Sequence, residues 1–202
     1  RAYEQALRDK RRFVIYQDGG IGTDEIENEL WKRHIDVSID DAVLDDKMTP
    51  ILREVYDDFC QGEFRSHLQT IETMMESGQL PPRGMIAGLD PYIKGLYQFA
   101  TDKQIRIIHE SFSFEAWLVW NRNLILQERA KELLDKGLIS GSTTNEFIRI
   151  MRQAKKYIKE SIEIRDTKIS QEIESLASLA DVALLLGTGH NHSMLVASLQ
   201  SS

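Results

Sequence analysis

The chain has 202 residues, of which 42% are hydrophobic and 28% are charged, and its formal net charge is −7 at pH 7. This length suits one compact domain with its own core, so we expect a single α/β domain over residues 1–202. The acidic balance opposes binding to phosphate backbones, and we expect no nucleic-acid partner. The chain opens with Arg1 instead of methionine, as a fragment or processed product lacking an upstream element would.

Cysteine content and hydropathy predict the compartment. Cys60 is the single cysteine, so it has no partner for an internal disulfide and fits an inert thiol in a reducing environment. No apolar run approaches the roughly 18 residues of a membrane span, and no charged-then-apolar leader opens the chain. We therefore expect a cytoplasmic location and no association with a membrane.

Three short apolar segments have the composition of buried strands, namely residues 13–16, 105–108 and 182–186. Long helical patterns separate them, as the crossover connections of parallel strands require. The sequence therefore predicts a helix-rich α/β fold with a small, mostly parallel sheet covered by long helices. Because three strands are few for such a sheet, we expect either weaker strands in stretches such as 36–39 or missing upstream strands.

The helices between these strands have recognisable starts and stops. A helix over 49–78 begins at Thr49-Pro50, with Gly62 as a local weak point, and a helix over 113–136 ends at Gly137. Asp90-Pro91 caps a shorter helix that ends near residue 103. The longest helix is predicted to begin with a capping box, Thr143 and Glu146, and to reach Leu176.

One arginine interrupts the apolar stripe of this longest helix. The stripe steps by threes and fours through Phe147, Met151, Ala154, Ile158, Ile162, Ile169, Ile173 and Leu176. Arg165 continues it between Ile162 and Ile169, where burial is costly unless the guanidinium meets a carboxylate or an anionic ligand. Three alternatives stay open for Arg165: an ion pair with a core acid, extension to solvent, and contact with a ligand. The neighbouring Asp166 is expected to be a surface acid.

Polar residues follow each predicted strand, at 17–20, 109–111 and 187–192. Parallel strands bring these groups to one carboxyl edge, where open α/β sheets bind ligands. Gly187 and Gly189 allow a sharp turn with backbone close to a ligand, and His190 can act there as acid, base or metal ligand. The alternative is a glycine turn with incidental surface histidines, and His192 fits that alternative better than His190 does.

Two acids at the other strand ends are further candidates. Glu110 and Asp18 can each serve as a base or a second ligand, or can simply cap the next helix. Alternation along the strand sends His109 and Glu110 to opposite faces, so at most one of them faces the site. The sequence has no Walker loop, G-x-G-x-x-G, G-x-S-x-G or H-E-x-x-H motif, which removes the common nucleotide, hydrolase and metalloprotease signatures.

A long helix bearing Ile164-Arg165-Asp166, followed by a hydrophobic strand and Gly187-Thr188-Gly189-His190, resembles the TraB, TIKI and erythromycin-esterase superfamily. The resemblance covers residues 162–194. It implies that His190 is a catalytic or metal-binding residue and that Arg165 is the active-site arginine. The family's earlier G-x-x-H motif has no counterpart here, and Gln17 and Asp18 stand where the family tends to have a glutamate.

These observations predict a hydrolase-like domain, of esterase or metallopeptidase type, that acts on a small-molecule or peptide substrate. Arg165 would stabilise an oxyanion, and a divalent metal would be held by His190 and His192. The alternative is a non-catalytic binding or regulatory domain for a small anionic ligand or a protein partner. The long amphipathic helices also suit self-association as a homo-oligomer.

Overall fold

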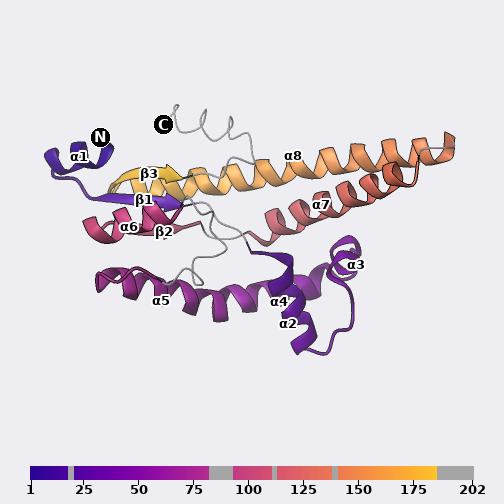
Figure 1. Ribbon diagram of the computed structural model, residues 1–202, viewed down its shortest axis with the longest axis horizontal. Coiled ribbons are helices and arrows are strands. Elements are labelled where there is room, and N and C mark those ends of the chain that lie inside the picture. Colours follow the sequence, from indigo (N-terminus) through magenta and orange to yellow (C-terminus); the bar gives the residue numbers. More distant parts are fainter. Residues whose placement is uncertain (18–20, 82–92, 111–112, 138–140, 186–202) are drawn as a thin grey trace.

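The structure is a computed structural model that describes residues 1–17, 21–81, 93–110, 113–137 and 141–185. Within these ranges, the side chains of residues 93, 94, 184 and 185 are not described. The chain forms a helix-rich α/β fold around a small parallel sheet, as the sequence predicted (Figure 1).

The sheet has β1 (Phe13–Gln17) at its centre, between β2 (Arg106–His109) and β3 (Asp181–Leu185). Both neighbours run parallel to β1, so the predicted parallel sheet is confirmed. The aromatic and β-branched residues of 13–16 favour this pleated, buried position. The register places Gln17 opposite His109, which brings the polar ends of β1 and β2 together.

The described part of the chain contains eight α-helices, of which α1 precedes β1 and the others lie between the strands. Their bounds are α1 (Ala2–Arg8), α2 (Thr23–Lys32), α3 (Ile39–Leu44), α4 (Thr49–Phe59), α5 (Arg65–Glu76), α6 (Ile93–Lys103), α7 (Phe114–Asp135) and α8 (Gly141–Ala177). A π-helical turn, η1 (Cys60–Phe64), joins α4 to α5 and contains the predicted weak point Gly62.

Helices cover both faces of the sheet. On one face, Tyr16 of β1 packs with Ile169 and Ile173 of α8. On the other face, Ile15 and Ile107 pack with residues of α5 and α6. Because consecutive strand residues point to opposite faces, each polar group at the carboxyl edge is assigned to one of these two layers.

The remaining core lies beyond the sheet, where α2, α3 and α4 pack against α7. Phe114 and Trp117 of α7 are buried there. Helix α8 lies alongside α7 and continues across the sheet, so it spans almost the length of the molecule (Figure 1). It therefore links the α7 core to the sheet.

Three predictions about local structure are wrong. Residues 36–39 form no strand, because Ser38 caps α3 and its Oγ accepts a hydrogen bond from the Asp41 N–H at 3.2 Å. Thr143 and Glu146 do not form the N-terminal capping box, because α8 already begins at Gly141. Met151 is exposed, whereas the other end of the stripe is buried against the sheet.

No helix in the described ranges combines the length and the apolar character needed to cross a lipid bilayer.

Two glycines of the α4–η1–α5 segment offer a matched pair of substitutions. A Cβ on Gly62 would meet nothing within 4 Å, and the backbone there is helical. We therefore expect Gly62→Ala to raise the free energy of unfolding by about 0.5–1 kcal/mol, because alanine loses less backbone entropy on folding. A Cβ on Gly78 would also meet nothing within 4 Å, but the backbone there has φ +77°. Gly78→Ala should therefore lower the free energy of unfolding. Urea denaturation measures both, and a destabilising Gly62→Ala would contradict the assignment.

Candidate functional site

Two of the predicted site residues, Glu110 and Arg165, lie within the described part of the chain. Asp18, Gly187, Gly189, His190 and His192 lie outside the described residues, and their roles stay predictions. The site is therefore built here from Glu110, Arg165 and the side chains around them.

Glu110 and Arg165 form a buried two-pronged ion pair at the carboxyl edge of the sheet. The Arg165 Nη2 donates to Glu110 Oε2 at 2.7 Å, and its Nε lies 3.0 and 3.1 Å from the two carboxylate oxygens. The side chains are 4% (Glu110) and 17% (Arg165) exposed. Arg165 thus meets a core carboxylate, the first of the three predicted alternatives, and does not extend to solvent.

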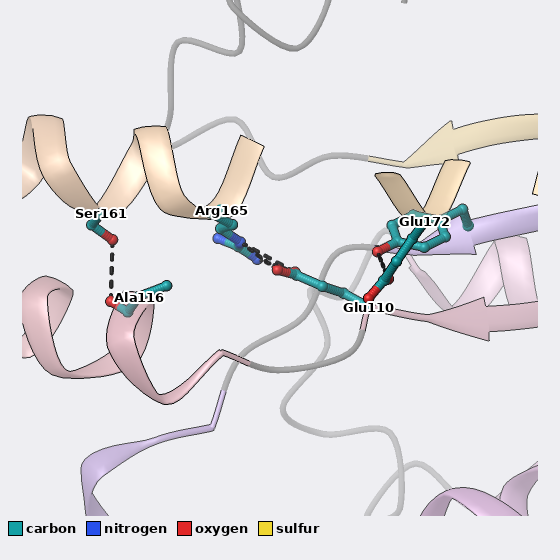
Figure 2. Close-up of polar contacts among 6 residues, drawn as sticks. Glu110, Ala116, Ser161, Arg165 and Glu172 are labelled. Carbon is teal, nitrogen blue, oxygen red and sulfur yellow. Dashed lines mark hydrogen bonds and ion pairs between the residues drawn. The ribbon is translucent and has the colours of Figure 1, made fainter. Parts of the chain in front are cut away.

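The backbone explains why this pair forms. Glu110 follows β2 directly, and its N–H donates to the carbonyl of Gln17 at 2.9 Å, which extends the ladder between β1 and β2 by one step. Alternation turns its side chain toward α8. One helical turn before Arg165, the Ser161 hydroxyl donates to the Ala116 carbonyl of α7 at 3.2 Å and anchors α8 (Figure 2). The arginine is therefore held opposite the strand end.

A second polar contact lies beside the ion pair, between Tyr16 of β1 and Glu172 of α8. The Tyr16 hydroxyl donates to the Glu172 carboxylate at 2.5 Å. Burial and then Glu172 raise the pKa of Tyr16 well above its usual range; Glu110 adds to this effect, and Arg165 opposes it. The Tyr16–Glu172 contact therefore lies near enough to the ion pair for both of its charges to influence the pKa of Tyr16.

Sequence reasoning missed Tyr16 and Glu172. Glu172 lies seven residues after Arg165, which places the two on the same face of α8 after two helical turns. That spacing is the signal that would have singled it out. In the sequence, Tyr16 is only one of the hydrophobic residues that predict the strand over 13–16.

The opposite face of the same edge carries another set of polar side chains. Tyr97 of α6 donates to Gln17 Oε1 at 3.3 Å, and its oxygen lies 3.4 Å from His109 Nε2. Burial lowers the pKa of His109, with Glu72 opposing and His67 reinforcing that shift. His109 and Glu110 point to opposite layers, as predicted from alternation.

Asp166 corrects one expectation, because it is 3% exposed and not a surface acid. Helix α8 contacts both α7 and the sheet, so a wider arc of it is buried than one apolar stripe describes. The acid next to Arg165 is consequently part of the interior.

The described residues provide a weak basis for a metal. Among them, no three or more His, Cys, Asp or Glu side chains gather in a way that would hold an ion. Both oxygens of Glu110 face Arg165, and Glu172 accepts from Tyr16. The predicted metal ligands His190 and His192 lie outside the described residues, and metal binding stays a prediction.

Cys60 lies in η1, away from this edge, and is partly buried. Burial raises the pKa of its thiol to about 11, with Tyr56 as the main opposing influence. At neutral pH the thiol is protonated and weakly nucleophilic, which supports the prediction of an unreactive cysteine.

Comparisons of this chain with protein-family models, with curated proteins and with solved structures find no match. The site is therefore interpreted from the chemistry of its own residues.

A double-mutant cycle measures the coupling of Glu110 and Arg165. Glu110→Gln and Arg165→Met should each lower the free energy of unfolding by about 3–5 kcal/mol, because each removes the oppositely charged partner of a charge that stays buried. The double variant should cost clearly less than the two losses added together. Urea denaturation of the four proteins tests this, and additive losses would show that the pair is not coupled.

The lowered pKa of His109 predicts a pH dependence of stability. Below the ordinary histidine pKa of about 6.5, the unfolded chain binds more protons than the folded chain. The contribution of His109 is thus complete above that pH and is lost as the pH falls toward its folded-state pKa. Wild type should therefore lose more stability than His109→Gln between pH 7.5 and 5.5.

Urea denaturation at the two pH values makes this comparison. The exposed His34 gives the matched control, and His34→Gln should follow the wild-type pH dependence. Equal losses in wild type and His109→Gln would contradict the assignment to His109.

Proposed function

We propose that this chain is a hydrolase-like domain whose catalytic centre includes Glu110 and Arg165 at the carboxyl edge of the sheet. The observation that carries the proposal is the buried ion pair at this edge. A buried ion pair is a poor means of stabilisation, since an apolar pair of similar volume often serves as well or better. Charged groups kept in a sheet's ligand-binding edge are therefore candidates for chemistry.

The proposed reaction is the hydrolysis of an ester or amide. Water adds to the substrate carbonyl carbon while the Glu110 carboxylate accepts a proton from that water. The positive charge of Arg165 stabilises the resulting oxyanion. Collapse of the tetrahedral intermediate breaks the bond to the leaving group, which takes up the proton from Glu110.

The neighbouring side chains would position these two groups. Tyr16 and Glu172 add a fixed hydrogen bond on the same face, and Ser161 holds α8 against α7. The proposed role of His190 as an acid, base or metal ligand, with His192 beside it, rests on the resemblance of residues 162–194 to the erythromycin-esterase superfamily. Dependence of the hydrolytic activity on a divalent metal at His190 and His192 is part of this proposal.

One observation favours the other candidate function, a non-catalytic binding or regulatory domain. Glu110 already engages Arg165 through two nitrogens, so the guanidinium charge is balanced by a protein carboxylate. An arginine in this state suits a structural or ligand-positioning role as well as a catalytic one. A substrate carbonyl would have to approach beside an existing ion pair.

Activity assays with matched variants separate the two functions. Wild type is tested on 4-nitrophenyl acetate, 4-nitrophenyl butyrate and a fluorogenic peptide library, with and without a chelator. We expect Glu110→Gln to lower kcat at least 100-fold, because a lost general base typically costs that much. Arg165→Lys keeps the charge but loses the planar two-pronged geometry, so an intermediate loss is expected.

Glu174→Gln provides the control. It removes an exposed acid of α8 that takes no part in the proposed site, and it should leave both stability and kcat close to those of wild type. Full activity in folded Glu110→Gln would rule out its catalytic role. A wild-type chain inactive on every substrate would favour the binding domain.

A further inference from the structure

A separate cavity lies on the opposite face of the sheet from the ion pair, between α5 and the end of β2. Its volume is about 330 Å³. That size is at the lower end of the roughly 300–1,000 Å³ of ligand pockets, so it suits a small metabolite. The residues that line it are Ile71, Glu72, Met75, Glu76, Gln104, Arg106, Ile107 and His109, and we call it the His109 cavity.

The inner wall of the His109 cavity is apolar. Ile71, Met75 and Ile107 are buried members of the core beneath it. Such a wall favours an aliphatic or aromatic ligand body, and Met75 can adapt its flexible side chain to that body.

His109 lines the cavity and can supply a hydrogen-bond acceptor to a ligand there. Because the Tyr97 hydroxyl donates its proton to Gln17 Oε1, the Tyr97 oxygen is left to accept from His109 Nε2. A neutral imidazole that is protonated on Nε2 has a lone pair on Nδ1. At 3.3 and 3.4 Å these contacts are long, so they favour this tautomer without locking it. Burial lowers the pKa of His109, which keeps the ring neutral at pH 7.

The charges around the cavity favour a cation. Glu72 and Glu76 contribute two carboxylates, and Arg106 contributes one guanidinium, which lies 3.3 Å from Glu72. The net formal charge of these three side chains is negative, and Arg106 already pairs with Glu72. An anionic ligand would meet the unbalanced Glu76 carboxylate, whereas an ammonium group would be attracted to it.

We propose that the His109 cavity binds a small primary amine with an apolar body. The body packs on Ile71, Met75 and Ile107, and the ammonium group donates to His109 Nδ1 near the carboxylates of Glu72 and Glu76. This site is independent of the proposed hydrolytic function, because Glu110 and Arg165 lie on the α8 face of the sheet.

The test uses three primary amines of increasing size: hexylamine, 2-phenylethylamine and tryptamine. Each is titrated into the ¹⁵N-labelled chain at pH 7.5, and long-range ¹H–¹⁵N spectra follow the imidazole nitrogens of His109. At least one amine should bind saturably and shift the Nδ1 resonance. The anion 3-phenylpropanoate and the neutral 2-phenylethanol, close in shape to 2-phenylethylamine, should bind at least fivefold more weakly.

Two variants locate the binding. His109→Leu removes the acceptor and should weaken the best amine more than tenfold, as expected for a lost hydrogen bond to a charged group. Glu76→Gln changes an exposed residue, should fold normally, and should weaken binding about two- to fivefold. Glu174→Gln removes an exposed acid from α8 and should leave affinity unchanged.

Several results would overturn the proposal: no saturable binding of any of the three amines, equal affinity for 3-phenylpropanoate, or equal losses in Glu76→Gln and Glu174→Gln. Glu110→Gln distinguishes the two sites, because it should reduce hydrolysis and leave amine binding intact. Loss of amine binding in folded Glu110→Gln would contradict the independence of the His109 cavity.

Discussion

The ion pair between Glu110 and Arg165 ties the end of β2 to α8, and the arrangement of the sheet edge depends on it. Glu110 is fixed by its backbone hydrogen bond to Gln17, so the strand end determines where the carboxylate lies. Arg165 is fixed because α8 is anchored on α7 through Ser161 and packs on the sheet through Ile169. Taking both charges out of water is expensive, and their mutual contact offsets part of that cost. The helix and the strand must therefore keep this spacing.

Alternation along two short strands separates the polar groups into two environments. Tyr16 and Glu110 face α8, where carboxylates and a guanidinium are in contact. Gln17 and His109 face α5 and α6, where both make long hydrogen bonds with Tyr97, beside an apolar wall and the carboxylates of Glu72 and Glu76. The first environment suits charge stabilisation in a reaction, and the second suits recognition of a small cation. Neighbouring residues in the chain thus serve different chemistry because the sheet lies between them.

Helix α8 explains both the successes and the failures of prediction for individual residues. The apolar period of α8 identified Arg165 as a charged residue within an apolar stripe. In the structure, Arg165 forms the ion pair with Glu110. The same period assigned Asp166 to the surface, which is wrong, since contact with α7 widens the buried arc. Glu172 lies seven residues after Arg165 and so on the same face of α8, but the helix gives no sign of the tyrosine that a distant strand brings to Glu172.

The sequence by itself determined the fold class, the three strands within one residue at each end, and the presence of polar groups after them, because composition and periodicity are local properties. It also determined that Arg165 needed a partner. Only the tertiary structure decided that the partner is Glu110, that Tyr16 pairs with Glu172, and that His109 borders a separate cavity. Those contacts join residues 55 and 156 positions apart, or across a sheet, and their formation depends on how strands and helices pack.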